Sequence, residues 1–155
     1  MLPTTKNPAE VPTNTTGQAE KERRTRSLGS LIVLIVDDMQ EIREMYSSYL
    51  RFCGIGVATA SDGAEALDVA GMCRPDVVVL DISMPGMGGW ETLEEIRRDS
   101  RLKDLPVILI SAYGKPETPH EAAVAGADSY LDKPCLPSQL LEEIRRVTNG
   151  RRTDH

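Results

Sequence analysis

The chain is 155 residues long, and at roughly 100 to 200 residues per domain this length allows one ordinary domain. Acidic side chains outnumber basic ones by 24 to 18, which gives a formal net charge of −6, and the aromatic residues are one Phe, one Trp and four Tyr. This composition excludes a multidomain machine, and it lacks the basic surface and aromatic stacking platforms of a protein that binds nucleic acid directly.

The cysteines, Cys53, Cys73 and Cys135, are scattered and show no spacing typical of a metal site or a paired redox site. A reduced, cytoplasmic environment is therefore expected. The longest apolar run, Leu31 to Val36, has six residues, whereas a helix that crosses a bilayer needs roughly 20. We expect no association with a membrane.

The first 30 residues contain prolines, threonines and a charged run at 20–26, but hardly any large apolar side chain. Such a stretch buries too little surface to offset the entropy lost on ordering, so residues 1–30 are expected to be a disordered tail. Residues 149–155 are expected to be a second, short tail. The folded domain is therefore predicted over residues 31–148, and this part carries the acidic excess.

Short apolar runs rich in β-branched residues alternate with longer stretches of helical periodicity. The runs predict strands at residues 31–36, 55–60, 76–80, 107–110 and 127–131. Two amphipathic helices are predicted from apolar residues at helical spacing, namely Ile42, Met45, Tyr46, Tyr49 and Leu50 in the first and Leu140, Leu141, Ile144 and Val147 in the last.

Two further helices are predicted from sequence signals that are typical of a helix N-terminus. Asp62 with Glu65 three residues later is a capping box. The stretch from Thr118 combines such a box with Pro119 at the first helical position, and Gly126 is expected to end that helix. Strands separated by helices of this length and joined by right-handed crossovers predict an α/β domain, with a doubly wound parallel sheet covered by helices on both faces.

Polar residues that can carry chemistry fall at the carboxyl ends of four predicted strands. Asp37 and Asp38 follow the first strand, Asp81 the third, Ser111 the fourth and Lys133 the fifth. In open α/β sheets, ligands bind at this edge. Each residue alone has an ordinary explanation as a turn former, a cap or a solvated charge, so it is their joint placement that indicates a site.

Three carboxylates at one edge would repel one another unless a cation lies among them. Oxygen ligands without a convergent His or Cys favour a hard ion, and Mg²⁺, which takes one or two carboxylates together with a phosphate oxygen, fits best. The histidines, His120 and His155, fall at a helix start and at the terminus. Neither is expected to act as a base or as a metal ligand.

Four short motifs contain these residues: Asp37-Asp38, Asp81 to Met87 (DISMPGM), Ser111-Ala112 and Tyr130 to Pro134 (YLDKP). Together they resemble the response regulator receiver domain of two-component signalling, and the resemblance covers about residues 31–148. It implies a flavodoxin-like, five-stranded sheet of order 2-1-3-4-5, an order that the residues alone do not determine.

The resemblance also implies a metal and phosphoryl site. Asp81 matches the phosphoacceptor of the family, Asp38 and Asp81 match side-chain ligands of Mg²⁺, and the Ser83 carbonyl matches a third ligand. Asp37 matches an outer acid that acts on the metal through water. The chemistry of the residues agrees, because the Asp81 carboxylate can act as a nucleophile while Mg²⁺ and Lys133 neutralise charge on the transferred group.

Other matched residues bear on switching. Ser111 and Lys133 match the switch hydroxyl and the phosphoryl-binding lysine, and Tyr130 matches an aromatic residue that enters the space left when the hydroxyl moves. The family has a cis bond before the proline at the position of Pro134, and a cis bond is least unfavourable before proline.

Ser83 and Tyr113 occupy two positions that resemble determinants of the lifetime of the phosphorylated state in this family. Hydrolysis of an aspartyl phosphate requires a water held in line behind phosphorus. Ser83 is too short to orient that water, and the Tyr113 ring can lie across its approach. Slow autodephosphorylation, over minutes or longer, is therefore expected.

The expected function is that of a phosphoacceptor, which takes a phosphoryl group from a phosphohistidine of a sensor histidine kinase or a histidine phosphotransfer protein onto Asp81. About seven residues follow the last predicted helix, too few for another domain. We therefore expect a stand-alone domain, not an enzyme towards other substrates, that binds a downstream protein target. Two alternatives stay open: a receiver-like module that binds partners without phosphorylation, and a metal-dependent phosphatase with an Asp nucleophile, for which Ser83 stands where a second acid is needed.

Overall fold

The computed structural model describes residues 31–112 and 119–150. The two tails predicted at the ends fall wholly or mostly outside these ranges, as do Tyr113 and Thr118. Over the described residues, five parallel strands form one sheet in the order β2-β1-β3-β4-β5. The predicted α/β, doubly wound, flavodoxin-like fold is therefore confirmed.

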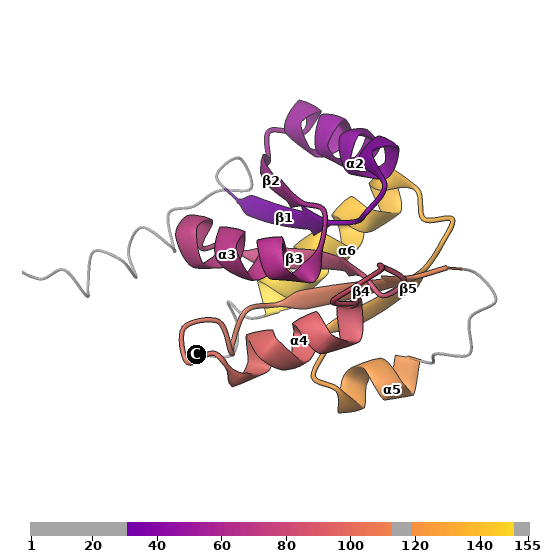
Figure 1. Ribbon diagram of the computed structural model, residues 1–155. Helices are drawn as coiled ribbons and strands as arrows, with labels where there is room; N and C mark the ends of the chain where they lie inside the picture. The colour runs from indigo at the N-terminus through magenta and orange to yellow at the C-terminus, as the bar shows by residue number, and fades with distance from the viewer. Residues whose placement is uncertain (1–30, 113–118, 151–155) are drawn as a thin grey trace, which may run out of the picture.

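Strands and helices alternate along the chain (Figure 1). The bounds of the strands are β1 (Ile32–Val36), β2 (Gly56–Ala60), β3 (Val77–Asp81), β4 (Val107–Ser111) and β5 (Ser129–Asp132). The helices are α2 (Gln40–Phe52), α3 (Gly63–Cys73), α4 (Gly89–Arg98), α5 (Pro119–Val124) and α6 (Pro137–Gly150). Asp81 and Ser111 therefore end β3 and β4, whereas the sequence placed them after these strands.

Helices cover both faces of the sheet, because alternate strand residues point to opposite sides. Val33 and Ile35 of β1 pack in one cluster with α2 and α6, while Leu34 and Val36 pack in another with α3, α4 and α5. Both layers are visible in Figure 1. Each large side chain buried in this way stabilises the fold by about 1.5–3 kcal/mol. Met45, predicted to face the core, is instead 42% exposed.

Met45 is exposed because the apolar face of α2 is already filled by its neighbours. Tyr46 and Leu50, one turn apart, are 3% and 0% exposed and occupy the centre of the contact with the sheet. Met45 precedes Tyr46 by one position, which turns it about 100° away from the centre of that face. The helix was predicted correctly, but its apolar stripe is narrower than expected.

The predicted capping box of α3 is present with one difference. The Asp62 Oδ1 accepts a hydrogen bond of 2.8 Å from the Glu65 amide. The Glu65 carboxylate reaches back to the amide and hydroxyl of Ser61, one residue earlier than a standard box, at 3.3 and 2.8 Å. The first turn of α3 therefore has a partner for an otherwise unsatisfied amide.

Arg97, near the end of α4, joins three segments of the chain through its guanidinium. Its Nη1 donates to the carbonyls of Leu105 and Lys103 at 2.7 and 3.0 Å. Its Nε and Nη2 donate to the carbonyl of Gly126 at 2.9 and 2.7 Å, and Nη2 also lies 3.1 Å from Asp128 Oδ2. Gly126 has a φ of +98°, which favours glycine, and ends the turn after α5. This guanidinium fixes the C-terminal end of α5 to α4.

We expect Arg97→Ala to lower the free energy of unfolding by about 2–4 kcal/mol, because several backbone carbonyls lose a charged donor at once. Urea denaturation followed by circular dichroism measures this change. Arg98→Ala is the matched control. Within the described ranges, Arg98 pairs with the exposed Glu94 and Glu95 on the helix surface, so its removal should change stability by less than about 0.5 kcal/mol. Equal losses in the two variants would contradict the assignment.

Candidate functional site

The carboxyl ends of the central strands meet at one edge of the sheet. The registers pair Val36 with Leu80, Asp81 with Ile110, and Ser111 with Asp132. Asp37 continues directly from β1, so its side chain emerges beside the end of β3. This alignment, which parallel pairing imposes, brings together residues that lie far apart in the sequence.

Three carboxylates gather at this edge. Ligand oxygens of Asp37, Asp38 and Asp81 all lie within 4.8 Å of one another. Asp37 and Asp81 are 4% and 3% exposed, whereas Asp38 is exposed. Burial raises the pKa of Asp37, the Asp81 carboxylate raises it further, and the Met39 amide and Lys133 only partly oppose this shift. Asp37 therefore takes up a proton more readily in the folded protein than in the unfolded chain.

Lys133 provides the positive charge of the cluster. Its Nζ lies 3.2 Å from Asp37 Oδ2 and 3.3 Å from Asp81 Oδ2. Burial alone would lower the pKa of Lys133, but the carboxylates of Asp81 and Asp37 outweigh this effect and raise it above its ordinary value. Lys133 is therefore a cation between the two buried carboxylates. The peptide bond between Lys133 and Pro134 is cis.

The two buried carboxylates are oriented in the same way. Asp37 Oδ1 accepts a hydrogen bond from the Met39 amide, and Asp81 Oδ1 accepts one from the Ser83 amide, both at 2.9 Å. Each aspartate thereby closes a short turn with the backbone two residues ahead. The second oxygen of each side chain is left to face Lys133 at the shared centre.

Two contacts that hold this site were not predicted from the sequence. The Tyr46 hydroxyl, buried on α2, donates a 2.8 Å bond to the carbonyl of Cys135 and so anchors the chain just after Lys133. Burial raises the pKa of Tyr46 to about 12. The signal for this contact was weak: Tyr46 belonged to an apolar stripe, and only the need of a buried phenol for a partner pointed further.

Gly89 is the second unpredicted contact, and it sets how closely α4 approaches the site. A Cβ at this position would lie 2.5 Å from the Asp81 carbonyl oxygen and 2.7 Å from Ile82 Cα. No side chain fits there without displacing the end of β3. The sequence showed only a Gly-Gly pair before Trp90, which gave no indication of what it packs against.

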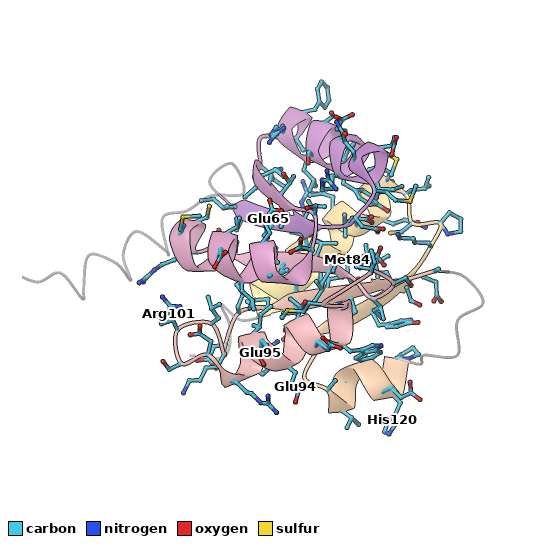
Figure 2. The ribbon with its side chains drawn as sticks, in the orientation of Figure 1. Glu65, Met84, Glu94, Glu95, Arg101 and His120 are labelled. Carbon is cyan, nitrogen blue, oxygen red and sulfur yellow. The ribbon has the colours of Figure 1, made fainter. Side chains whose placement is uncertain are left out.

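The other residues predicted for the site lie near the cluster of Asp37, Asp38, Asp81 and Lys133, but their side chains bond elsewhere or are exposed. Ser111 is fully buried, and its hydroxyl donates to the Ala112 carbonyl at 3.3 Å rather than to an aspartate. Tyr130 is half-buried against the cluster shared with α3 and α4, and Ser83 is exposed. Figure 2 shows His120 on α5 projecting away from the sheet.

The donor set fits Mg²⁺. Three carboxylates and one ammonium leave two negative charges, the charge that one divalent cation neutralises, and the candidate ligand atoms found here are oxygens. Asp37, Asp38 and Asp81 are the side chains that would hold the ion. At such a site the metal lowers the repulsion among the carboxylates and leaves coordination positions for another oxygen ligand.

We expect Mg²⁺ to raise the melting temperature of the protein, because an ion that binds only the folded state stabilises it by mass action, by about 2.7 kcal/mol at 100 times the dissociation constant. Asp38→Ala should abolish the gain. Differential scanning fluorimetry with MgCl₂, against NaCl of equal ionic strength, measures it. Asp104→Ala, an exposed aspartate elsewhere, should respond like the wild type.

The gain from Mg²⁺ should shrink as the pH is lowered. A raised pKa means that Asp37 contributes stability only at low pH, when it is protonated, and loses this contribution as the pH rises through that pKa. Ionised Asp37 therefore opposes folding at neutral pH, and Mg²⁺ offsets this effect, whereas protonated Asp37 competes with the metal. A gain that grows on acidification, or an Asp38→Ala variant that responds fully, would contradict the assigned site.

Comparison with known proteins adds independent findings. A family model described as the response regulator receiver domain matches residues 33–145. A probable transcriptional regulator, ycf27 of Guillardia theta, is 44% identical over 115 residues, which cover 74% of this chain and 44% of the relative. The DNA-binding dual master transcriptional regulator RpaA of Synechocystis is 34% identical over 122 residues, covering 79% and 50%. The chain thus spans about half the length of these relatives.

Solved structures resemble the whole described domain. The chemotaxis response regulator CheY4 of Vibrio cholerae superposes with a TM-score of 0.70 at 39% identity, covering 76% of this chain and 98% of that one. A CheY-like receiver domain protein of Methanospirillum hungatei gives a TM-score of 0.73 at 29% identity, covering 81% and 98%. Among the described residues, none of the helices has the length and apolar character required to cross a membrane.

Proposed function

The chain belongs to the response regulator receiver domain family, and from this membership we propose that it is a phosphoacceptor in a two-component or phosphorelay system. Asp81 takes a phosphoryl group from a phosphohistidine of a sensor histidine kinase or a histidine phosphotransfer protein. The observation that carries this proposal is the Asp81 carboxylate, which is buried, held by its own turn, and 3.3 Å from Lys133 within a cluster of three acids.

The transfer moves one phosphoryl group. An Asp81 carboxylate oxygen attacks phosphorus, the phosphorus–nitrogen bond of the donor breaks, and the imidazole leaves with the electron pair and takes up a proton. Lys133, already a cation at this position, neutralises charge on the phosphoryl oxygens. Bound Mg²⁺ supplies further positive charge there. The Asp38 and Asp81 carboxylates and the Ser83 carbonyl would hold the ion, and Asp37 would act on it through a bound water.

Switching follows from the product on Asp81. We propose that the Ser111 hydroxyl exchanges its bond to Ala112 for one to a phosphoryl oxygen. Tyr130, half-buried on the neighbouring strand β5, then moves into the space released. The surface formed by α5, β5 and α6 changes as a result, and a downstream protein target binds the changed surface with a different affinity. The domain, residues 31–148 between its two tails, acts in the cytoplasm through protein contacts.

Acetyl phosphate tests the proposal. This small donor carries a transferable phosphoryl group, so the full chain incubated with it and Mg²⁺ should gain the mass of one phosphoryl group, as seen by intact-protein mass spectrometry. Adding EDTA before the donor should prevent the gain. A chain that gains no mass with Mg²⁺ present, while remaining folded by circular dichroism, would overturn the proposal.

The aspartyl phosphate should be long-lived, with a half-life of minutes or more, because Ser83 is too short to orient an attacking water. We expect Ser83→Asn to speed hydrolysis several-fold, and Tyr113→Glu to do the same. Loss of the phosphoryl mass after removal of the donor, in Mg²⁺ buffer without EDTA, gives the rates. The conservative Ser83→Thr serves as control. Unchanged rates in both Asn and Glu variants would show that these positions do not set the lifetime.

A further inference from the structure

A second polar site lies along one flank of α2, beside the edge strand β2. It is a cavity of about 280 Å³, and none of the acceptor-site aspartates nor Lys133 lines it. The lining residues are Gln40, Arg43, Glu44, Ser47, Ser48 and Arg51 of α2 and Thr59 of β2. On α2 they recur three, four, seven, eight and eleven positions apart, which places them on one stripe of the helix.

The charge balance of this cavity favours an anion. Arg43 and Arg51 supply two guanidinium groups, and Glu44 supplies the one carboxylate in the lining. The Glu44 carboxylate already accepts a 2.8 Å bond from Gln40 Nε2. In the described part of the chain, neither arginine forms an ion pair. The charged side chains of the lining thus sum to +1, and the one carboxylate among them is already bonded to Gln40 Nε2.

Both arginines are anchored and still have donors to spare. Arg43 Nη1 donates to the carbonyl of Asp37 at 2.7 Å, and Arg51 Nη2 donates to that of Val57 at 3.2 Å. A guanidinium has five N–H donors, so each retains several for a ligand. Because each guanidinium already bonds a backbone carbonyl, its side chain loses little conformational freedom when its remaining donors bind a ligand.

Ser47 is the independent sign of a ligand. Its side chain is 3% exposed, it lines the cavity, and its Oγ has no hydrogen-bond partner within the described structure. A buried hydroxyl without a partner is unfavourable, and such groups in proteins usually have one. An oxyanion in the cavity would give this hydroxyl an acceptor once the side chain adopts a rotamer that faces it.

We propose that this cavity, bounded by Arg43, Ser47, Arg51 and Thr59, binds the phosphate group of a small phosphorylated molecule. One guanidinium is enough to pair with a carboxylate in the two-bond fashion, whereas a phosphate monoester has several acceptor oxygens and a double negative charge, which suit a lining with two guanidiniums and several hydroxyls. The proposal goes beyond the phosphoacceptor function and does not depend on it.

Glycerol 3-phosphate is a suitable probe, because a phosphate monoester does not phosphorylate aspartate. The full chain is titrated with it in EDTA, without Mg²⁺, and amide NMR shifts are followed. We expect saturable shifts of Ser47, Ser48 and Thr59 at millimolar concentration or below. NaCl at matched ionic strength should not reproduce them. Shifts that do not saturate, or that occur only around Lys133 and Asp81, would overturn the proposal.

Variants make the assignment specific. Arg51→Gln should weaken binding at least tenfold, and Ser47→Ala at least threefold with no loss of melting temperature. Arg145→Gln, which removes an exposed charge from α6, should leave binding unchanged. Equal weakening in Arg51→Gln and Arg145→Gln would reduce the effect to overall charge and overturn the site. Acetate binding as tightly as the phosphate monoester would equally overturn the choice of phosphate.

Discussion

Replacing Asp81 with Asn should abolish phosphoryl uptake from acetyl phosphate, with no mass gain by intact-protein mass spectrometry under conditions that modify the wild type fully. The reason is chemical, because an amide oxygen is a far weaker nucleophile than a carboxylate and offers Mg²⁺ less negative charge. The variant should fold. An Asn side chain can keep the bond from the Ser83 amide, and Lys133 keeps Asp37 as a partner.

Asp132→Asn is the matched control for Asp81→Asn. Asp132 is an exposed aspartate at the end of β5, close to the same edge of the sheet, and its substitution removes the same charge. It should leave the mass gain intact. Full modification of Asp81→Asn, mapped by peptide analysis to Asp37 or Asp38, would show that a different carboxylate is the acceptor.

Lys133→Met should have two separable effects. Uptake from acetyl phosphate should slow about 100-fold, because a fixed charge next to the phosphoryl oxygens is lost. Without Mg²⁺ at neutral pH, the free energy of unfolding should fall by roughly 2–3 kcal/mol, since the two buried carboxylates of Asp37 and Asp81 lose their counter-charge. This figure lies below the usual cost of breaking a buried pair, because Lys133 is 23% exposed.

Mg²⁺ and acid should each restore part of the stability lost in Lys133→Met. The ion replaces the missing positive charge, and protonation of Asp37, whose pKa is raised by burial, removes one of the two buried negative charges. Urea denaturation at two pH values, with and without MgCl₂, separates these effects. Lys103→Met, an exposed control, should show neither. A loss in Lys133→Met that is independent of both Mg²⁺ and pH would contradict the charge-balance argument.

The fold could be predicted because local and global signals agree. β-Branched runs marked β1, β3 and β4, which are buried on both faces, and caps such as Asp62 marked helix starts. Strand ends were off by one residue at Asp81 and Ser111. A polar side chain suggests a loop, whereas backbone pairing with the next strand continues through it.

The hydrogen bonds that hold the site and the helices around it could not be predicted in the same way. The bond from Tyr46 to the Cys135 carbonyl spans 89 residues, and four hydrogen bonds of Arg97 also end on backbone carbonyls. Every residue carries a carbonyl, so no sequence pattern marks which one is used. The acidic cluster was predictable because its members are distinctive side chains at strand ends, while the groups that hold them in place are not.

Among the described residues, the C-terminal end of α5 is the end that the Arg97 guanidinium holds to α4. That end is tied through Gly126 and Asp128 to Arg97, and the helix is six residues long, about 9 Å at 1.5 Å per residue. Because this end is held, we expect a tilt of α5 to displace Pro119 farther than Val124. A partner that contacts the first turn of α5 would therefore detect a larger displacement than one that contacts the last turn.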